Sequence, residues 1–185
     1  MNVATCALKG ILIIEPKVFE DSRGYFFEAY NEAVFRQAGI TASFLQDNQS
    51  RSSFGVIRGL HYQLHPHAQA KLVRVLRGTI LDVVVDIRKD SPTLGQHFSI
   101  ELSAGNRKQL YIPHGFAHGF SVLSETAEVL YKCDSLYHRE SEGGIRYDDP
   151  ALGIDWKLDT GNATVSEKDR ALPLFAEHVS NFTFS

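Results

Sequence analysis

Short segments in which apolar and polar residues alternate are the feature of this chain that most restricts its fold. In 79–87 the apolar residues share one face: Leu81, Val83, Val85 and Ile87. Asp82 and Asp86 lie on the opposite face, as a period of two residues requires. Segments 98–102 and 129–133 alternate in the same way. This pattern predicts β-strands rather than amphipathic helices.

Turn residues separate these segments at 91–92, 104–106 and 113–115. We expect 71–88 to form a hairpin, with an apolar run at 72–76 and a turn at Arg77-Gly78. Many short strands with few helices favour an antiparallel sandwich or barrel, and we prefer an all-β jelly-roll barrel.

One helix is well marked. Asn31 can cap it, Glu32 lies in its first turn and Gly39 can end it. The segment after Leu152 contains Trp156 and the run 166–169, for which we expect a few short peripheral helices packed on the barrel.

Length and composition restrict the class of protein. With 185 residues, the chain is most simply one domain, 1–185. Its net charge of -3 argues against general nucleic-acid binding, which needs a basic surface. The apolar run 11–14 is too short for a signal peptide core or a membrane span. Two cysteines, Cys6 and Cys133, favour free thiols and a cytoplasmic protein.

An imidazole and three cations are concentrated in 58–63 and 71–74: His61, Arg58, Lys71 and Arg74. Histidine can accept a proton near neutral pH, and a lysine can stabilise the negative charge left behind. The cluster indicates carbon-acid chemistry on an anionic substrate. Strand alternation places His61 opposite Leu60 and Tyr62, facing into the barrel; a hydrogen-bonded core histidine is the alternative.

The eight histidines raise the question of a metal site. His65, His67 and His118 resemble the layout of cupin barrels, which often hold a metal with three histidines and a glutamate. Lys71 stands near the place of the acidic ligand, and a cation there repels a metal ion. We therefore predict no metal site and a solvated loop at His65 and His67.

Several ordered motifs resemble one known family. They are 21–28 (DSRGYFFE), 46–48 (QDN), 58–63 (RGLHYQ), 71–74 (KLVR), 112–120 (IPHGFAHGF), 131–132 (YK) and 166–169 (SEKD). Together they span about Gly10 to Leu174 and resemble the dTDP-4-dehydrorhamnose 3,5-epimerase (RmlC) family. The resemblance implies a cupin-type barrel that works as a metal-independent homodimer without a cofactor.

The resemblance also implies an activity. The family epimerises dTDP-4-dehydro-6-deoxy-glucose at C3 and C5, giving dTDP-4-dehydro-β-L-rhamnose for dTDP-L-rhamnose biosynthesis. Each C–H next to the C4 ketone loses a proton on one face and regains one on the other. This inversion needs no nicotinamide, and the chain has no G-x-G-x-x-G fingerprint.

The implied catalytic residues are His61 as base, Asp169 as its support, Lys71 beside the enolate oxygen and Tyr131 as acid. A phenol is protonated at neutral pH and can donate. Taken alone, Asp169 also fits a helix start or the surface, Lys71 a strand edge, and Tyr131 a barrel core.

The implied substrate-binding residues are Arg23, Phe26, Glu28, Gln46, Asp47, Asn48, Arg58, His118, Tyr137, Glu142 and Lys168. Arg23 and Arg58 suit a pyrophosphate, because guanidinium groups bind phosphate oxygens in pairs. Phe26 and Tyr137 could equally stack on thymine or pack in a core.

Three rival functions remain open from the sequence. The first is an isomerase that epimerises only C3 of a dTDP-keto-sugar or isomerises the ketone. The second is a metal-dependent cupin enzyme. The third is a non-catalytic jelly roll that binds nucleotide sugars and needs neither His61 nor Tyr131.

Overall fold

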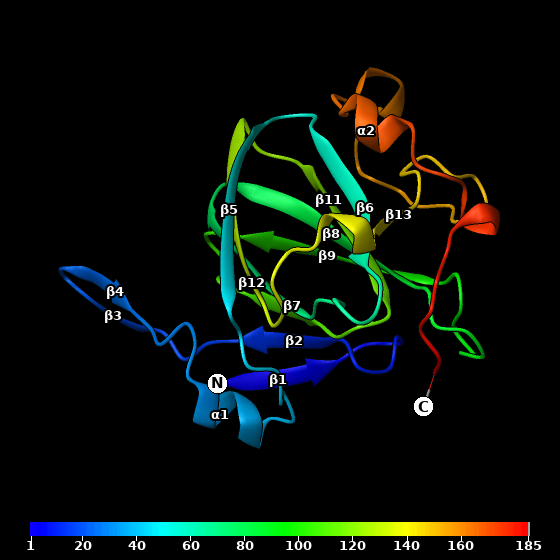
Figure 1. Ribbon diagram of the computed structural model, residues 1–185. Coiled ribbons are helices and arrows are strands. Elements are labelled where there is room, and N and C mark those ends of the chain that lie inside the picture. Colours follow the sequence, from blue (N-terminus) through cyan, green and yellow to red (C-terminus); the bar gives the residue numbers. More distant parts are fainter. Residues whose placement is uncertain (185) are drawn as a thin grey trace.

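Two antiparallel sheets face each other to form the body of the protein, as a computed structural model of residues 1–184 describes it (Figure 1). The six-stranded sheet has the order β1 (Asn2–Thr5), β2 (Leu12–Glu15), β10 (Gln109–Ile112), β7 (Lys71–Arg77), β12 (Thr126–Cys133), β5 (Gln46–Ser53). The five-stranded sheet has the order β13 (Glu142–Gly144), β6 (Ile57–Gln63), β11 (Phe116–Val122), β8 (Thr79–Asp86), β9 (His97–Ser103). The predicted all-β jelly-roll barrel is confirmed.

Strands β3 (Phe19–Asp21) and β4 (Gly24–Phe26) form a separate two-stranded arm that projects from the body (Figure 1). The helical elements are short: α1 (Glu32–Gln37), α2 (Glu167–Arg170), η1 (Arg139–Ser141), η2 (Thr160–Asn162) and η3 (Phe175–Glu177). None of the helices within 1–184 has the length and apolar character needed to cross a membrane.

The predicted hairpin over 71–88 is wrong. Strand β7 pairs with β10 and β12, whereas β8 pairs with β9 and β11, so the two strands lie in different sheets. Gly78 turns the chain from one sheet to the other with a φ of 76°. A Cβ at Gly78 would lie 2.0 Å from the carbonyl oxygen of Thr126, so only glycine fits this corner.

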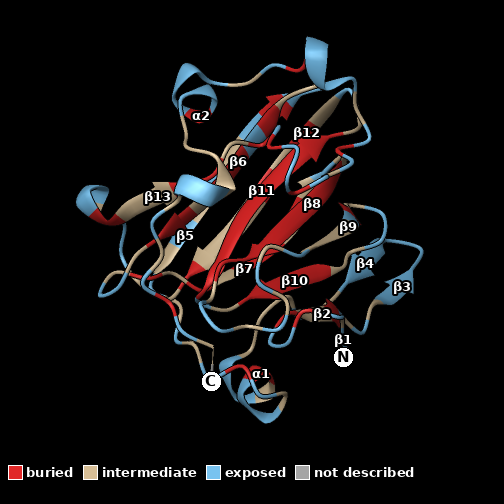
Figure 2. Cartoon of the chain, turned by 90° about the vertical axis from the view of Figure 1, so that its right-hand side faces the viewer, coloured by how far each residue is buried: buried red, intermediate tan, exposed pale blue. Residues whose placement is uncertain are grey.

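Apolar side chains from both sheets fill the barrel. Val73, Val84 and Phe120 belong to one buried cluster although they come from three strands. Strand β11 is buried throughout and β8 over nearly its whole length (Figure 2). The alternation predicted for 79–87 is confirmed, and it places Asp82 on the same interior side as Val84.

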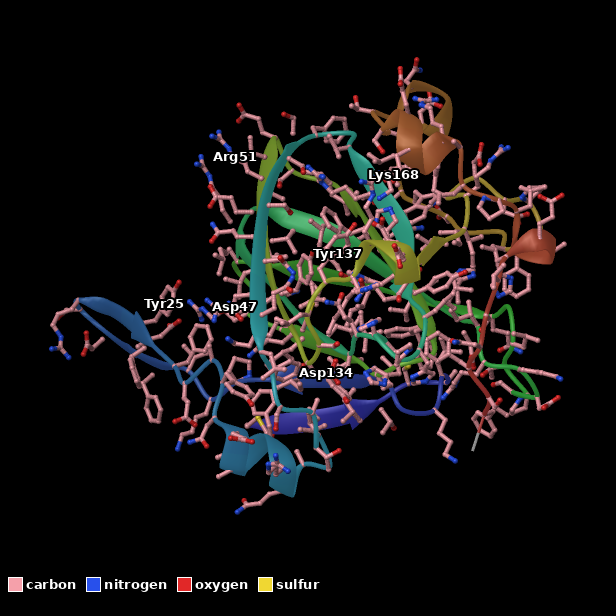
Figure 3. All side chains as sticks on the ribbon, viewed as in Figure 1. Tyr25, Asp47, Arg51, Asp134, Tyr137 and Lys168 are labelled. Carbon is pink, nitrogen blue, oxygen red and sulfur yellow. The ribbon has the colours of Figure 1, made fainter. Side chains whose placement is uncertain are left out.

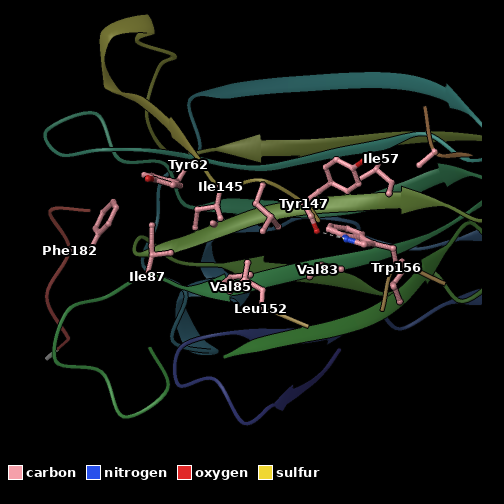
Figure 4. Close-up of a cluster of buried hydrophobic side chains, with 14 of the residues drawn as sticks. Ile57, Tyr62, Val83, Val85, Ile87, Ile145, Tyr147, Leu152, Trp156 and Phe182 are labelled. Atoms are coloured by element: carbon pink, nitrogen blue, oxygen red, sulfur yellow. Dashed lines mark hydrogen bonds between the residues drawn. The ribbon is translucent and has the colours of Figure 1, made fainter. Parts of the chain in front are cut away.

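The outer face of the five-stranded sheet is covered by the segment that follows β13 (Figure 4). Trp156 is only 1% exposed, and its indole N–H donates to the carbonyl of Tyr147 at 2.8 Å. On the opposite side of the molecule, Phe35 of α1 packs with Ile14 and Leu72. Asn31 caps α1, as predicted.

Candidate active site

A cavity of about 220 Å³ lies between the inner faces of the two sheets. Residues of both sheets line it: Ser50, Arg58, His61, Lys71, His118, Gly119, Phe120 and Tyr131. Five of the predicted site residues therefore meet in one place. A more open hollow of about 460 Å³ shares Arg58 and His61 with this cavity and extends to Lys168 and Asp169. His61 stands where the two spaces meet.

A bulge in β6 aims two of these side chains at the cavity. His61 lies opposite His118 of β11, but Arg58 lies opposite Phe120, so β6 carries one extra residue between them. Because alternation reverses at each residue, the extra residue places Arg58 and His61 on the same side. Gly59 at the bulge has a φ of 127°, and a Cβ there would lie 2.6 Å from Gly119 Cα.

His61 is paired with Asp169 of α2. The distance from His61 Nε2 to Asp169 Oδ1 is 2.8 Å, and the two side chains are 35% and 7% exposed. A carboxylate accepts hydrogen bonds, so Nε2 carries the proton and Nδ1 is left with a lone pair. This arrangement makes His61 Nδ1 a proton acceptor at the cavity.

Asp169 is fixed by its own surroundings. The backbone N–H of Gly59 donates to Asp169 Oδ2 at 3.2 Å, and Asp169 N–H donates to Ser166 Oγ, which caps α2, at 3.0 Å. Burial alone would raise the pKa of Asp169, but hydrogen bonds from His61 and Gly59 outweigh it and lower that pKa. The carboxyl is therefore ionised where it supports His61.

Lys71 and Tyr131 face His61 from the other sheet. Lys71 Nζ lies 5.8 Å from the centre of the Tyr131 ring. Burial lowers the pKa of Lys71, while the negative charge of Asp82 acts against this change, as a thiolate at Cys133 would. Lys71 forms no ion pair with any carboxylate in the described part of the chain. Its ammonium group is thus available to an anion in the cavity.

Burial also keeps Tyr131 protonated. Burial raises the pKa of Tyr131, and a thiolate at Cys133 would raise it further, while Arg58 lowers it. In β12, Tyr131 lies opposite Asn48 of β5 and Val73 of β7. A buried, protonated phenol opposite an imidazole is a potential proton donor.

His118 forms a second pair with a carboxylate. Its Nε2 lies 2.9 Å from Asp82 Oδ2, and the two side chains are 7% and 0% exposed. Burial lowers the pKa of His118, although the negative charge of Asp82 acts in the other direction. His118 is therefore a neutral imidazole at the cavity.

Five predicted binding residues form a polar network beside the cavity. Figure 3 labels two of them, Tyr137 and Lys168. Gln46 Nε2 donates to Asn48 Oδ1 at 3.1 Å, and the N–H of Tyr137 donates to Gln46 Oε1 at 2.9 Å. Glu142 accepts a hydrogen bond from the Tyr137 hydroxyl at 3.2 Å and forms an ion pair with Lys168 at 2.7 Å. The strand β5 and the segment 137–142 thus meet at one rim.

Four predicted site residues lie away from the cavity. Arg23 and Phe26 are on the projecting arm, where the Arg23 side chain is 87% exposed and pairs with Asp21. Glu28 follows the arm and accepts a hydrogen bond from Asn31 Nδ2 at 3.1 Å. Asp47 points to the opposite side of β5 from Asn48 and pairs with Lys132 at 2.9 Å.

The sequence analysis did not identify Asp82 as part of the site. The signal was an aspartate within the apolar run of 79–87, where burial without a partner is costly. His65 and His67 lie in the loop between β6 and β7, as predicted. Across residues 1–184, no group of three or more histidine, cysteine, aspartate or glutamate side chains is arranged to hold a metal ion.

Known proteins are similar to this chain in sequence and in fold. Residues 5–177 match the family model described as dTDP-4-dehydrorhamnose 3,5-epimerase. The enzyme of that name from Methanothermobacter thermautotrophicus is 52% identical, over 89% of this chain and 89% of its own.

Two solved structures have nearly the same fold. The dTDP-4-dehydrorhamnose 3,5-epimerase of Elizabethkingia anophelis has a TM-score of 0.92 and 52% identity, covering 96% of this chain and 97% of its own. The epimerase of Legionella pneumophila, in complex with dTDP-4-keto-L-rhamnose, has a TM-score of 0.91 and 48% identity, covering 95% and 93%. The expected resemblance is thus confirmed: this chain belongs to the dTDP-4-dehydrorhamnose 3,5-epimerase family.

Proposed function

We propose that this protein epimerises dTDP-4-dehydro-6-deoxy-glucose at C3 and C5 to give dTDP-4-dehydro-β-L-rhamnose, for dTDP-L-rhamnose biosynthesis. One observation carries the proposal: His61 and Tyr131 line the same cavity from opposite sheets, with Lys71 beside them. An inversion needs a base on one face of the carbon and an acid on the other, and this cavity supplies both.

The base step begins at His61. Its Nδ1 takes the proton from the carbon next to the ketone, and the C–H electron pair moves into an enolate with its charge on the C4 oxygen. Asp169 stabilises the imidazolium that forms, because a carboxylate 2.8 Å away favours the charged ring. The Lys71 ammonium stabilises the enolate oxygen, an effect that is large in a site with little water.

The acid step completes the inversion. The hydroxyl of Tyr131 gives its proton to the opposite face of the same carbon, and the enolate collapses back to the ketone. His61 is then protonated and Tyr131 deprotonated, and both are restored by proton exchange with solvent. Electrons are neither gained nor lost, so the step requires no oxidant or reductant. A second cycle at the other carbon gives the doubly inverted sugar.

The nucleotide lies along the polar rim in this proposal. Arg58 borders both hollows and suits a pyrophosphate. Gln46, Asn48 and Glu142 offer donors and acceptors for the sugar and the base, and Lys168 adds a charge. Tyr137 is 53% exposed and presents a ring on which thymine can stack. The ligand of the Legionella pneumophila structure belongs to the same chemical class.

The arm has its role in a homodimer. Arg23 and Phe26 lie outside the cavity of their own chain, and Phe26 is 70% exposed. We propose that the arm brings these residues and Glu28 to the cavity of a second copy in the cytoplasm. Mixing the variants Arg23→Ala and His61→Ala then restores activity, because each mixed dimer holds one intact site. No recovery in a mixture shown to exchange subunits would contradict this arrangement.

The reaction is tested by incubating the protein with the substrate in deuterated water. Two epimerisations place deuterium at both C3 and C5 of the product, which mass spectrometry and NMR locate. Label at C3 alone would assign the chain to the C3-only class. Complete absence of label would remove the epimerase function. Repeating the assay after treatment with a chelator tests the metal-dependent rival, which predicts loss of activity.

A further inference from the structure

The pair formed by Asp82 and His118 has no role in the proton transfers proposed above. Asp82 lies on β8 and His118 on β11, and they are diagonal neighbours on the interior face because His118 lies opposite Val84. The carboxylate of Asp82 is completely buried, and its Oδ2 accepts a hydrogen bond from His118 Nε2 at 2.9 Å.

The other oxygen of Asp82 has no partner. Asp82 Oδ1 is buried and accepts no hydrogen bond from the described residues. Asp86, on the same strand and equally buried, shows how this fold satisfies a structural carboxylate. Its oxygens accept hydrogen bonds from Arg88, Ser91 and Thr93 at 2.7 to 2.9 Å. A buried carboxylate that is only half satisfied calls for an explanation other than stability.

The hydrogen bond to Asp82 determines which nitrogen of His118 faces a ligand. A carboxylate only accepts, so it fixes the proton of the neutral imidazole on Nε2 and leaves a lone pair on Nδ1. His118 Nδ1 makes no hydrogen bond within residues 1–184, and it is not among their enclosed unpaired atoms. Because His118 lines the cavity, its lone pair is accessible from there.

We propose that Asp82 is a positioning residue that locks His118 in the Nε2–H form, so that Nδ1 accepts a hydrogen bond from a ring hydroxyl of the keto sugar. This inference rests on the proposed function for the identity of the ligand. His118 lies directly opposite His61 in the register of β6 and β11. A hydroxyl held by His118 therefore fixes the sugar ring beside the base.

The substitution Asp82→Asn tests the proposal with little change of shape. The amide of asparagine can donate to Nε2, which stabilises the Nδ1–H form and removes the acceptor from the cavity. We expect kcat/KM to fall about 10- to 100-fold, the effect of one lost or mismatched hydrogen bond in a buried site. The affinity for dTDP alone remains unchanged, because the nucleotide binds at the rim.

The form of the imidazole is measured directly by ¹⁵N NMR, without any activity assay. We expect His118 of the wild type to carry its proton on Nε2, and the Asp82→Asn variant to populate the Nδ1–H form. A wild-type His118 with its proton on Nδ1 would overturn the proposal even if the variant failed to fold. If the wild type instead failed to epimerise the substrate, the proposed function would fail while this measurement still stood.

A second variant protein distinguishes an effect of Asp82 on His118 from an effect on Lys71, whose charge Asp82 also supports. In a His118→Gln protein, Asp82→Asn should cause no further loss of kcat/KM, because the two residues act as one unit. An equal loss in both backgrounds would show that Asp82 acts elsewhere. Asp86→Asn is the matched control: it lowers the melting temperature and leaves the His118 signal unchanged.

Discussion

The proposed active site contains two pairs of histidine and aspartate with similar geometry and different surroundings. His61–Asp169 and His118–Asp82 have nitrogen–oxygen distances of 2.8 and 2.9 Å, and the two histidines lie opposite each other on neighbouring strands. The His61 side chain is 35% exposed, whereas that of His118 is 7% exposed. The distances within the pairs therefore do not distinguish them, whereas the exposure of the two imidazole rings does.

The difference lies in what stabilises charge around each pair. Asp169 accepts hydrogen bonds from both His61 and Gly59, and its pKa is lowered. Asp82 has one oxygen without a partner, and burial lowers the pKa of His118. The His61 ring is partly exposed and is paired with a carboxylate that its surroundings keep ionised. A buried ring remains neutral, so His61 is suited to act as a base and His118 to accept a hydrogen bond.

The largest expected difference between the pairs is in rate. His61→Ala should reduce turnover at least about 10³-fold, because it removes the base of both steps. His118→Ala should reduce it about 10- to 100-fold, because one hydrogen bond to the sugar is lost. Both variants should still bind dTDP in a calorimetric titration. Equal losses of turnover in the two variants would contradict the division of roles.

A second test concerns Tyr131, the proton donor that the proposed mechanism combines with His61 and not with His118. In Tyr131→Phe, His61 can still remove the proton and return it to the same face. Deuterium should therefore enter the recovered substrate from deuterated water, while inverted product forms about 100-fold more slowly. Tyr62→Phe is a control, since its hydroxyl donates to Val179 and does not line the cavity. If deuterium entry fell as far as product formation, Tyr131 would have a role earlier in the reaction.

The pattern of residues was enough to predict the barrel and five of the residues that line the cavity. Alternation predicts the strands, and the ordered motifs indicate the family to which the chain belongs. It was not enough to predict strand pairing at Gly78. An apolar segment, a glycine turn and another apolar segment fit both a hairpin and a corner between sheets. The crowding at Gly78, which depends on Thr126 far along the chain, decides between them.

The sequence also did not reveal to which face of a strand individual side chains point. Simple alternation over 58–61 places Arg58 and His61 on opposite faces, and only the bulge at β6 brings both to the cavity. The glycine at 59 was the available sign, because an isolated glycine in a strand often marks a bulge. The arm residues Arg23, Phe26 and Glu28 matched family motifs, but one chain alone does not place them at its own cavity.

The bulge donates a hydrogen bond to only one of the two pairs, which gives a third test. Gly59→Ala should destabilise the protein by about 1–3 kcal/mol in urea unfolding, because its Cβ would lie 2.6 Å from Gly119 Cα. Gly24→Ala is the matched control, with a similar φ of 129° and no atom within 4 Å of the added Cβ. It should cost about 1 kcal/mol, the strain of the backbone alone.

The same variant connects stability with the His61 pair. The N–H of Gly59 donates to Asp169 and not to Asp82, so folded Gly59→Ala protein should lose turnover. The added Cβ would lie 3.0 Å from the His118 carbonyl oxygen and can shift the His118 signal, but the ring should keep its proton on Nε2 because its bond to Asp82 is retained. A His118 proton on Nδ1 with unchanged turnover would mean that the bulge organises the other pair.

The smallest expected effect is a pH dependence of stability that comes from His118. An unfolded histidine has a pKa near 6.5, and the pKa of His118 is lowered in the fold by burial. Below about pH 6.5 the unfolded chain therefore binds a proton that the folded chain does not, so stability falls as the pH falls through this window. His118→Gln, whose amide can still donate to Asp82, should remove up to about 1.4 kcal/mol per pH unit of this dependence. Urea unfolding at several pH values between 5 and 7.5 measures it, with the exposed His65→Gln as control. An unchanged slope in His118→Gln would mean that His118 has the same pKa in the folded and unfolded protein, and the contrast with His61 would be lost.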